Sequence, residues 1–172
     1  LESADVWAQP GLFRLDENGR PTEVAGVPPD YFSATGQLWG NPLYRWEALR
    51  ERGYDWWLAR LRSAAARFDA ARLDHFIGFT RAWAVPAGAK TAEKGRWDPA
   101  PGDDFLGHVT RQLPELELVA ENLGLVTPEV EALRERFGLP GIKVLQFSFS
   151  TGEGGLPDRY PRRCVAYTGT HD

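Results

Sequence analysis

The sequence predicts a parallel α/β fold, because helical and strand patterns alternate along most of the chain. The stretches 71–79, 116–124 and 164–172 support this class, since in each an apolar run leads into a carboxylate. The intervals between these carboxylates are long enough for at least one strand–helix–strand unit each. Periodicity alone leaves open whether the sheet is open or closes into a barrel.

The N-terminal third is predicted to be rich in loops. Residues 16–20 predict a turn within a short hairpin. The segment 26–42 is rich in Gly and Pro but also holds Tyr31, Phe32 and Trp39. A disordered linker would lack such aromatic residues, so we expect an ordered loop of the kind that carries function.

From residue 54 onward, the predicted elements follow one another with short connections. In order they are a helix at 54–68, a strand ending at Asp74, a loop at 83–102, a helix at 103–113, a strand ending at Glu121, a helix at 127–137, a strand at 142–149, a loop at 151–163 and a strand before His171. The first helix places apolar residues at helical spacing. Pro114 ends the second, and Thr127 with Pro128 is a typical start for the third.

Composition excludes several classes of function. A net charge of −4 gives no basic surface for nucleic acid, and no apolar run approaches the ~20 residues of a membrane span. Cys164 is the single cysteine, and no Cys/His grouping has metal-ligand spacing, so we expect no disulfide, metal site or cofactor. No signal peptide is recognised and Met is absent, so we expect an internal fragment of a longer cytoplasmic protein.

The strand-end acids carry the strongest chemical signal. Alternation places Arg72 and Asp74 on one face of a strand, where the cation favours the ionised carboxylate. This pair suits a nucleophile, although by itself it is as consistent with a structural ion pair. If the strands share a sheet, then Asp74, Glu121 and Asp172 meet at its carboxyl edge. Three carboxylates in one pocket suit the cleavage of glycosidic bonds.

Over essentially its whole length, the chain resembles the 4-α-glucanotransferases called amylomaltases or disproportionating enzymes, which are relatives of the α-amylases. The matching motifs are Gly-Val-Pro-Pro-Asp-Tyr-Phe-Ser at 26–33, Arg-Leu-Asp-His-Phe at 72–76, Val-Ala-Glu-Asn-Leu-Gly at 119–124, Gly-Leu-Pro-Gly-Ile-Lys-Val-Leu-Gln-Phe at 138–147 and Tyr-Thr-Gly-Thr-His-Asp at 167–172. The stretch 26–44 is the part most specific to amylomaltases, whereas the strand-end acids are shared with α-amylases in general.

The resemblance implies a fragment of a single catalytic (β/α)8 TIM barrel, roughly its middle-to-late half. Residues 1–53 would form a loop-rich insertion over the cleft, and 54–172 would carry the acids. Asp74 would be the nucleophile, Glu121 the acid/base and Asp172 the transition-state stabiliser of a retaining mechanism. The substrates would be maltooligosaccharides or starch-derived α-glucans, without nucleic acid or membrane partners. The residues expected to bind sugar are Asp30, Gln37, Trp39, Arg72, His75 and His171.

The sequence departs from the family pattern at three positions. Ala34, Ile77 and Asn122 stand where the family often has an acidic residue, an arginine and an aspartate. Two other functions stay open: an α-amylase-type hydrolase, which uses the same three acids, and a catalytically inactive glucan-binding domain. The loop at 26–42 favours the transferase, and the three intact acids disfavour an inactive domain. Oligomeric state and chain-length preference stay open.

Overall fold

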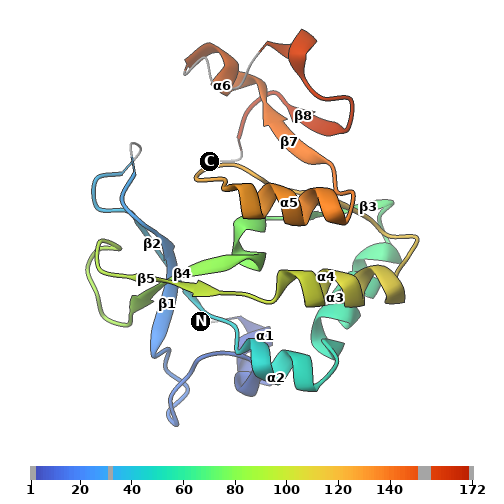
Figure 1. Ribbon diagram of the computed structural model, residues 1–172. Coiled ribbons are helices and arrows are strands. Elements are labelled where there is room, and N and C mark those ends of the chain that lie inside the picture. Colours follow the sequence, from blue (N-terminus) through green and yellow to red (C-terminus); the bar gives the residue numbers. More distant parts are fainter. Residues whose placement is uncertain (1–2, 31–32, 151–155, 171–172) are drawn as a thin grey trace. The chain divides into compact units, whose positions relative to one another are not determined.

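A computed structural model describes residues 3–30, 33–150 and 156–170 (Figure 1). The chain divides into two compact units. The first comprises Leu1–Leu58 and Gly78–His108, and the second comprises Ala59–Ile77 and Val109–Asp172. No helix within the described ranges combines the length and the apolar character needed to cross a membrane.

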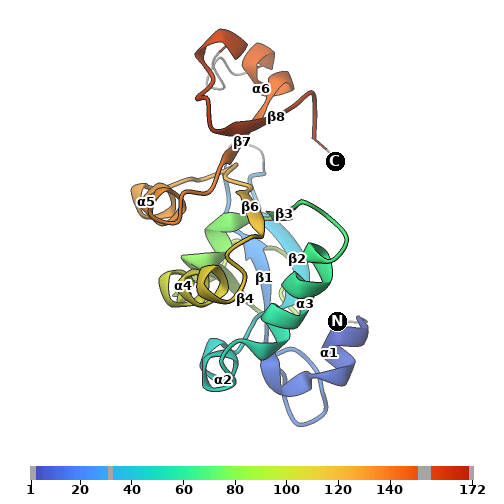
Figure 2. The same ribbon diagram turned by 90° about the vertical axis from the view of Figure 1, so that its right-hand side faces the viewer.

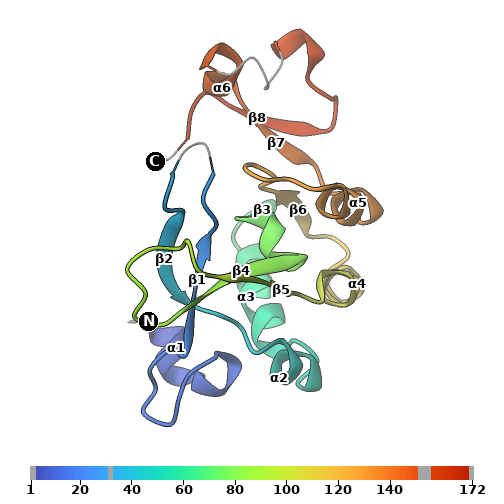
Figure 3. The same cartoon turned by 60° about the vertical axis from the view of Figure 1, so that its left-hand side comes forward.

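A four-stranded antiparallel sheet organises the first unit (Figure 3). Its strands lie in the order β2-β1-β4-β5. Their bounds are Glu23–Val27 for β1, Gln37–Pro42 for β2, Arg81–Pro86 for β4 and Arg96–Pro99 for β5. The predictions of a continuous loop at 26–42 and of a loop at 83–102 are therefore wrong, since both segments contribute paired strands.

Both loops were predicted from the glycine and proline content of these segments. In a strand, however, glycine can also be required because two backbones pack closely together. Gly26 pairs with Leu38 of β2 and Trp83 of β4. A Cβ atom at Gly26 would lie 2.4 Å from the backbone oxygen of Gln37, so only glycine fits this position without a shift. Glycine in this segment thus marks a close approach between strands.

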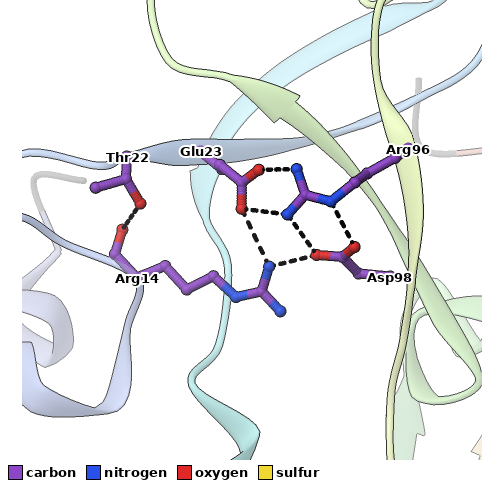
Figure 4. A network of polar contacts seen from close by, with 5 residues as sticks. All are labelled: Arg14, Thr22, Glu23, Arg96 and Asp98. Atoms are coloured by element: carbon purple, nitrogen blue, oxygen red, sulfur yellow. Dashed lines mark hydrogen bonds and ion pairs between the residues drawn. The ribbon is translucent and has the colours of Figure 1, made fainter.

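Four charged side chains connect β1 with β5 and with Arg14, which precedes β1 in the chain (Figure 4). Glu23 accepts hydrogen bonds from Arg14 at 3.2 Å and from Arg96 at 2.9 Å. Asp98 bonds to both arginines, with its Oδ1 atom 2.9 Å from Nε of Arg96. Hydrogen bonds from Arg96, with the charges of both arginines, hold the pKa of Glu23 below its usual value although burial opposes the shift.

Short helices and an aromatic cluster complete the first unit. The helices are α1 (Ala4–Ala8), η1 (Pro10–Leu12) and α2 (Trp46–Glu51), none of which has a clear sequence pattern because each is too short for one. The predicted turn at 16–20 is confirmed by a bridge that pairs Leu15 with Pro21. Aromatic rings pack with centroids 5.2–6.3 Å apart, among them Tyr44, Trp46, Tyr54, Trp57, Phe79 and Phe105.

Parallel strand pairs organise the second unit, as the sequence predicts. β3 (Ala70–Leu73) pairs with β6 (Glu117–Ala120), and β7 (Gly141–Val144) pairs with β8 (Cys164–Tyr167). The N–H of Ala120 donates to the carbonyl oxygen of Pro140 at 2.8 Å, which joins the end of β6 to the residue before β7. The strands predicted to end at Asp74 and Glu121 are both confirmed.

Helices at the expected places connect these strands. They are α3 (Asp55–Ala65), α4 (Gly102–Gln112) and α5 (Pro128–Arg136), with Thr127 as the N-cap of α5. Two further short helices are η2 (Phe76–Phe79) and η3 (Pro157–Arg159). Val130 and Leu133 form the buried face of α5. Helices α3 and α4 each begin in the first unit and end in the second.

The predicted strand at 142–149 is only half right. β7 ends at Val144, and the chain continues as α6 (Leu145–Ser150), as Figure 2 shows. The four residues of β7 pair one to one with the four of β8, from Gly141 with Cys164 to Val144 with Tyr167. Beyond that point β8 offers no further backbone partner, so a helix satisfies the backbone of the next residues by itself.

Candidate active site

Glu121 directly follows β6, and both its backbone N–H and its backbone carbonyl form hydrogen bonds to residues in or after β3. Its N–H donates to the carbonyl oxygen of Leu73 at 3.0 Å, and its own carbonyl accepts from Phe76 N–H at 2.9 Å. Its side chain accepts from the N–H of His75 through Oε2 and from the N–H of Leu123 through Oε1, each at 2.7 Å. Glu121 is 8% exposed, and among the described residues it is the one charged residue that is buried.

The surroundings of Glu121 favour its protonated form. Burial raises its pKa, and the negative charge of Asp74 adds to that effect. The two backbone donors and the charge of Arg72 act in the opposite direction without cancelling it. A glutamate that keeps its proton above the usual pH range is suited to act as a general acid.

Asp74 occupies a contrasting environment at the end of β3. Its side chain is 67% exposed, and its Oδ1 atom accepts a hydrogen bond from the guanidinium of Arg72. The pairing that alternation predicts is therefore confirmed. The Arg72 guanidinium carbon lies 5.7 Å from the ring centroid of Tyr167 at the end of β8. The Nε atom of Arg72 is buried and has no hydrogen-bond partner within the described part of the chain.

His75 lies in the turn that follows Asp74 and contacts Glu121. It adopts a φ of +46°, a left-handed conformation that is uncommon outside glycine. This conformation follows Asp74 immediately and directs the His75 N–H to the Glu121 carboxylate. Burial lowers the pKa of the imidazole, and the charge of Asp74 opposes that shift. A neutral imidazole can both donate and accept hydrogen bonds.

The structure brings together four of the predicted site residues, namely Arg72, Asp74, His75 and Glu121, all within the second unit. His171 and Asp172 lie outside the described residues.

The other three predicted site residues, Asp30, Gln37 and Trp39, belong to the first unit. All three are exposed, and the indole Nε1 of Trp39 donates to Gln37 Oε1 at 3.1 Å. Oδ1 of Asp30 accepts from the N–H of Ser33 at 2.9 Å.

The contacts of two residues, Tyr167 and Asn122, were missed at the level of sequence. Tyr167 is the last residue of an apolar strand, and nothing in the sequence predicted the contact between its ring and Arg72. Asn122 was noted only as a departure from the family pattern, whereas its side chain bonds to Glu131 and to the N–H of Ile142. These contacts join residues that belong to or follow separate strands and helices, which sequence spacing does not reveal.

Comparison with known proteins agrees with the resemblance. A sequence model of the family described as 4-alpha-glucanotransferase matches residues 1–172. The 4-alpha-glucanotransferases of Thermus thermophilus and Synechocystis are 55% and 53% identical to the chain, covering 99% of it and 35% of their own length. The structure of amylomaltase from Streptococcus agalactiae in complex with acarbose superposes with a TM-score of 0.92 at 41% identity, over 99% of this chain and 35% of that one. The chain thus spans about a third of the relatives it matches, and it belongs to the 4-alpha-glucanotransferase family.

Proposed function

We propose that the protein containing this chain is a 4-α-glucanotransferase that moves α-1,4-glucan segments between maltodextrins with retention of configuration. Membership of the 4-alpha-glucanotransferase family supports transfer as the reaction. The observation that carries the retaining mechanism is the contrast between two acids that follow the paired strands β3 and β6. Glu121 is buried with a raised pKa, whereas Asp74 is exposed and paired with Arg72. Two carboxyl groups in environments of this kind divide into an acid and a nucleophile.

In the first half-reaction, the Asp74 carboxylate attacks the anomeric carbon of the donor glucan. Glu121 gives its proton to the glycosidic oxygen, the carbon–oxygen bond breaks, and the leaving segment departs with that proton. The glucan is then bound covalently to Asp74. Arg72 orients the Asp74 carboxylate for the attack, and Asp172 stabilises the oxocarbenium-like transition state.

In the second half-reaction, Glu121 acts as the base. It removes the proton from the 4-hydroxyl of an acceptor glucan, whose oxygen attacks the anomeric carbon and releases Asp74. The two inversions together give retention. Hydrolysis would follow the same course with water as the acceptor, so the acids by themselves do not separate the two reactions.

The proposal includes the architecture around these residues. The parallel pairs β3–β6 and β7–β8 are consistent with part of a (β/α)8 barrel, in which acids follow the strand ends. Asp30, Gln37, Trp39, His75 and His171 would contact glucose units, with residues 1–53 over the cleft. The substrates would be maltooligosaccharides or starch-derived α-glucans, and the protein would act in the cytoplasm.

Product analysis on maltotriose tests the reaction in the enzyme that contains this chain. Transfer gives glucose together with maltodextrins longer than the substrate, whereas hydrolysis gives only glucose and maltose. The substitution Asp74→Ala should abolish both sets of products, because no covalent intermediate can form. Asp69→Ala, which removes an exposed acid before β3, is the matched control and should leave the product pattern intact. Longer maltodextrins from Asp74→Ala would refute the assignment.

A further inference from the structure

The side chain of Asn122, next to the buried acid, is anchored at both of its ends. Its Nδ2 atom donates to Oε1 of Glu131 on α5 at 2.7 Å. Its Oδ1 atom accepts from the N–H of Ile142 on β7 at 2.9 Å. The two contacts need a donor and an acceptor in one side chain, which an amide supplies and a carboxylate does not.

The partner of Asn122 on α5 is itself held in place. Glu131 accepts from Nε and Nη2 of Arg134 at 2.9 and 2.6 Å, and Nη1 of Arg134 donates to the carbonyl oxygen of Leu139 at 2.8 Å. Burial opposes ionisation of Glu131. The hydrogen bonds from Arg134 and Asn122, with the charge of Lys143, nevertheless hold its pKa below the usual value. The acceptor offered to Asn122 is therefore a charged oxygen, which makes the stronger kind of hydrogen bond.

The space around the amide is closed on the β7 side by Gly141. A Cβ atom at Gly141 would lie 2.8 Å from Oδ1 and 2.9 Å from Nδ2 of Asn122. Contacts this short do not occur without a shift of one partner. A side chain at position 141 would therefore displace the Asn122 amide, and glycine avoids this clash. Asn122 is thus fixed by packing as well as by its hydrogen bonds.

We propose that Asn122 is a positioning residue that fixes the acid/base Glu121 through the backbone on either side of it. This inference rests on the proposed function of Glu121. Asn122 lies between Glu121 and Leu123, and the N–H of Leu123 is one of the two donors to the Glu121 carboxylate. A rotation of the backbone at Asn122 would therefore shift the Leu123 N–H relative to the Glu121 carboxylate and change the position of the acid. General acid catalysis is sensitive to such movements, since a 1 Å misplacement can cost ~10²-fold in rate.

An exchange of donor and acceptor tests the inference. Asn122→Asp sets two carboxylates against each other, and Glu131→Gln turns an amide donor toward either Arg134 or Asn122. The double variant Asn122→Asp/Glu131→Gln allows every hydrogen bond again, with Gln as donor to Asp and as acceptor from Arg134. Glu135→Gln is the matched control, because this exposed carboxylate also accepts from Arg134, at 3.4 Å, whereas the Asn122 amide donates to Glu131.

The measurement is kcat/KM in the enzyme that contains this chain, with two donors. Maltotriose needs a proton on its leaving oxygen, whereas α-maltosyl fluoride has a leaving group that needs little help from an acid. Each single variant should lose about tenfold on maltotriose and less than about twofold on the fluoride. The double variant should recover to within about threefold of the parent on maltotriose, and the control should match the parent on both donors.

Two results would overturn the inference: equal losses on both donors, or a double variant no more active on maltotriose than the singles. The double variant decides the test even where a single variant does not fold, because it can keep all the hydrogen bonds. Glu121→Gln, measured beside them, separates the two proposals. If it shows the donor dependence and the Asn122 variants do not, only the positioning role is wrong. If Glu121→Gln shows no donor dependence, both proposals are wrong.

Discussion

The substitution Glu121→Gln gives the sharpest test of the proposed chemistry, because it removes the proton donor while changing the side-chain volume little. The carboxylate accepts one backbone N–H on each oxygen, from His75 and from Leu123, both at 2.7 Å. A glutamine has one acceptor oxygen and one NH₂ group, so it can accept only one of these bonds. Its NH₂ group would then face the second N–H, donor against donor.

These contacts set the expected size of the effects. Loss of general acid and base help should lower the transfer rate on maltotriose by about 10²–10⁴-fold. For stability, one unsatisfied buried N–H costs about 1–3 kcal/mol, and removal of a buried charge acts in the opposite direction. The melting temperature should therefore change by only a few degrees, which separates loss of chemistry from loss of fold.

The pH dependence follows from the raised pKa of Glu121. The first half-reaction needs the protonated acid, so its rate should fall as the pH rises through that pKa. Because burial raises the pKa, this fall should lie above the value of about 4.3 that is usual for glutamate. The fall should be absent in Glu121→Gln, whose side chain does not titrate.

The assay is transfer on maltotriose across a pH series, with a thermal melt of each protein. A variant that keeps full activity on maltotriose would refute the assignment of Glu121 as the acid. So would a pH profile whose alkaline fall persists unchanged in Glu121→Gln.

Three further predictions concern the first unit. Trp39→Ala should raise the ratio of hydrolysis to transfer by up to about tenfold, which corresponds to a loss of ~1.4 kcal/mol of ring contact with the acceptor sugar. The ratio is measured as glucose release without acceptor divided by maltodextrin elongation with acceptor. An unchanged ratio would mean that Trp39 does not bind the acceptor. Gly26→Ala should lower the free energy of unfolding by about 1–3 kcal/mol, because its Cβ would lie 2.4 Å from a carbonyl oxygen of β2. Gly11→Ala, with nothing within 4 Å, is the control for a urea titration. Glu23→Gln should cost about 1 kcal/mol at pH 7, because it removes the negative charge and one of the two oxygens that accept from Arg96 and Arg14. Since these contacts lower the pKa of Glu23, the difference should disappear as pH falls through that lowered pKa, and a constant difference would contradict the ion-pair explanation.

Local sequence patterns were enough to predict the alternation of helices and strands in the second unit and the positions of Asp74 and Glu121 at strand ends. These features depend on local periodicity and capping, which neighbouring residues express directly. The sequence pattern failed where a segment's structure depends on distant partners. Residues 81–86 form β4 because β1 is available to pair with them, and residues 96–99 form β5 because β4 is available in turn. Residues 145–150 form a helix because β8 ends at Tyr167.

The different environments of the two acids depend on how the chain folds in three dimensions. Both follow an apolar strand in the sequence. The neighbouring Arg72 marks Asp74 as the ionised acid, but nothing in the sequence predicts the burial of Glu121. The fold buries Glu121 between two backbone donors and leaves Asp74 exposed beside Arg72. The bond of Asn122 to Glu131 likewise depends on where α5 lies relative to β6. Burial and hydrogen bonding between separate elements set the pKa of a carboxyl group, and neither is encoded in the spacing of residues along the chain.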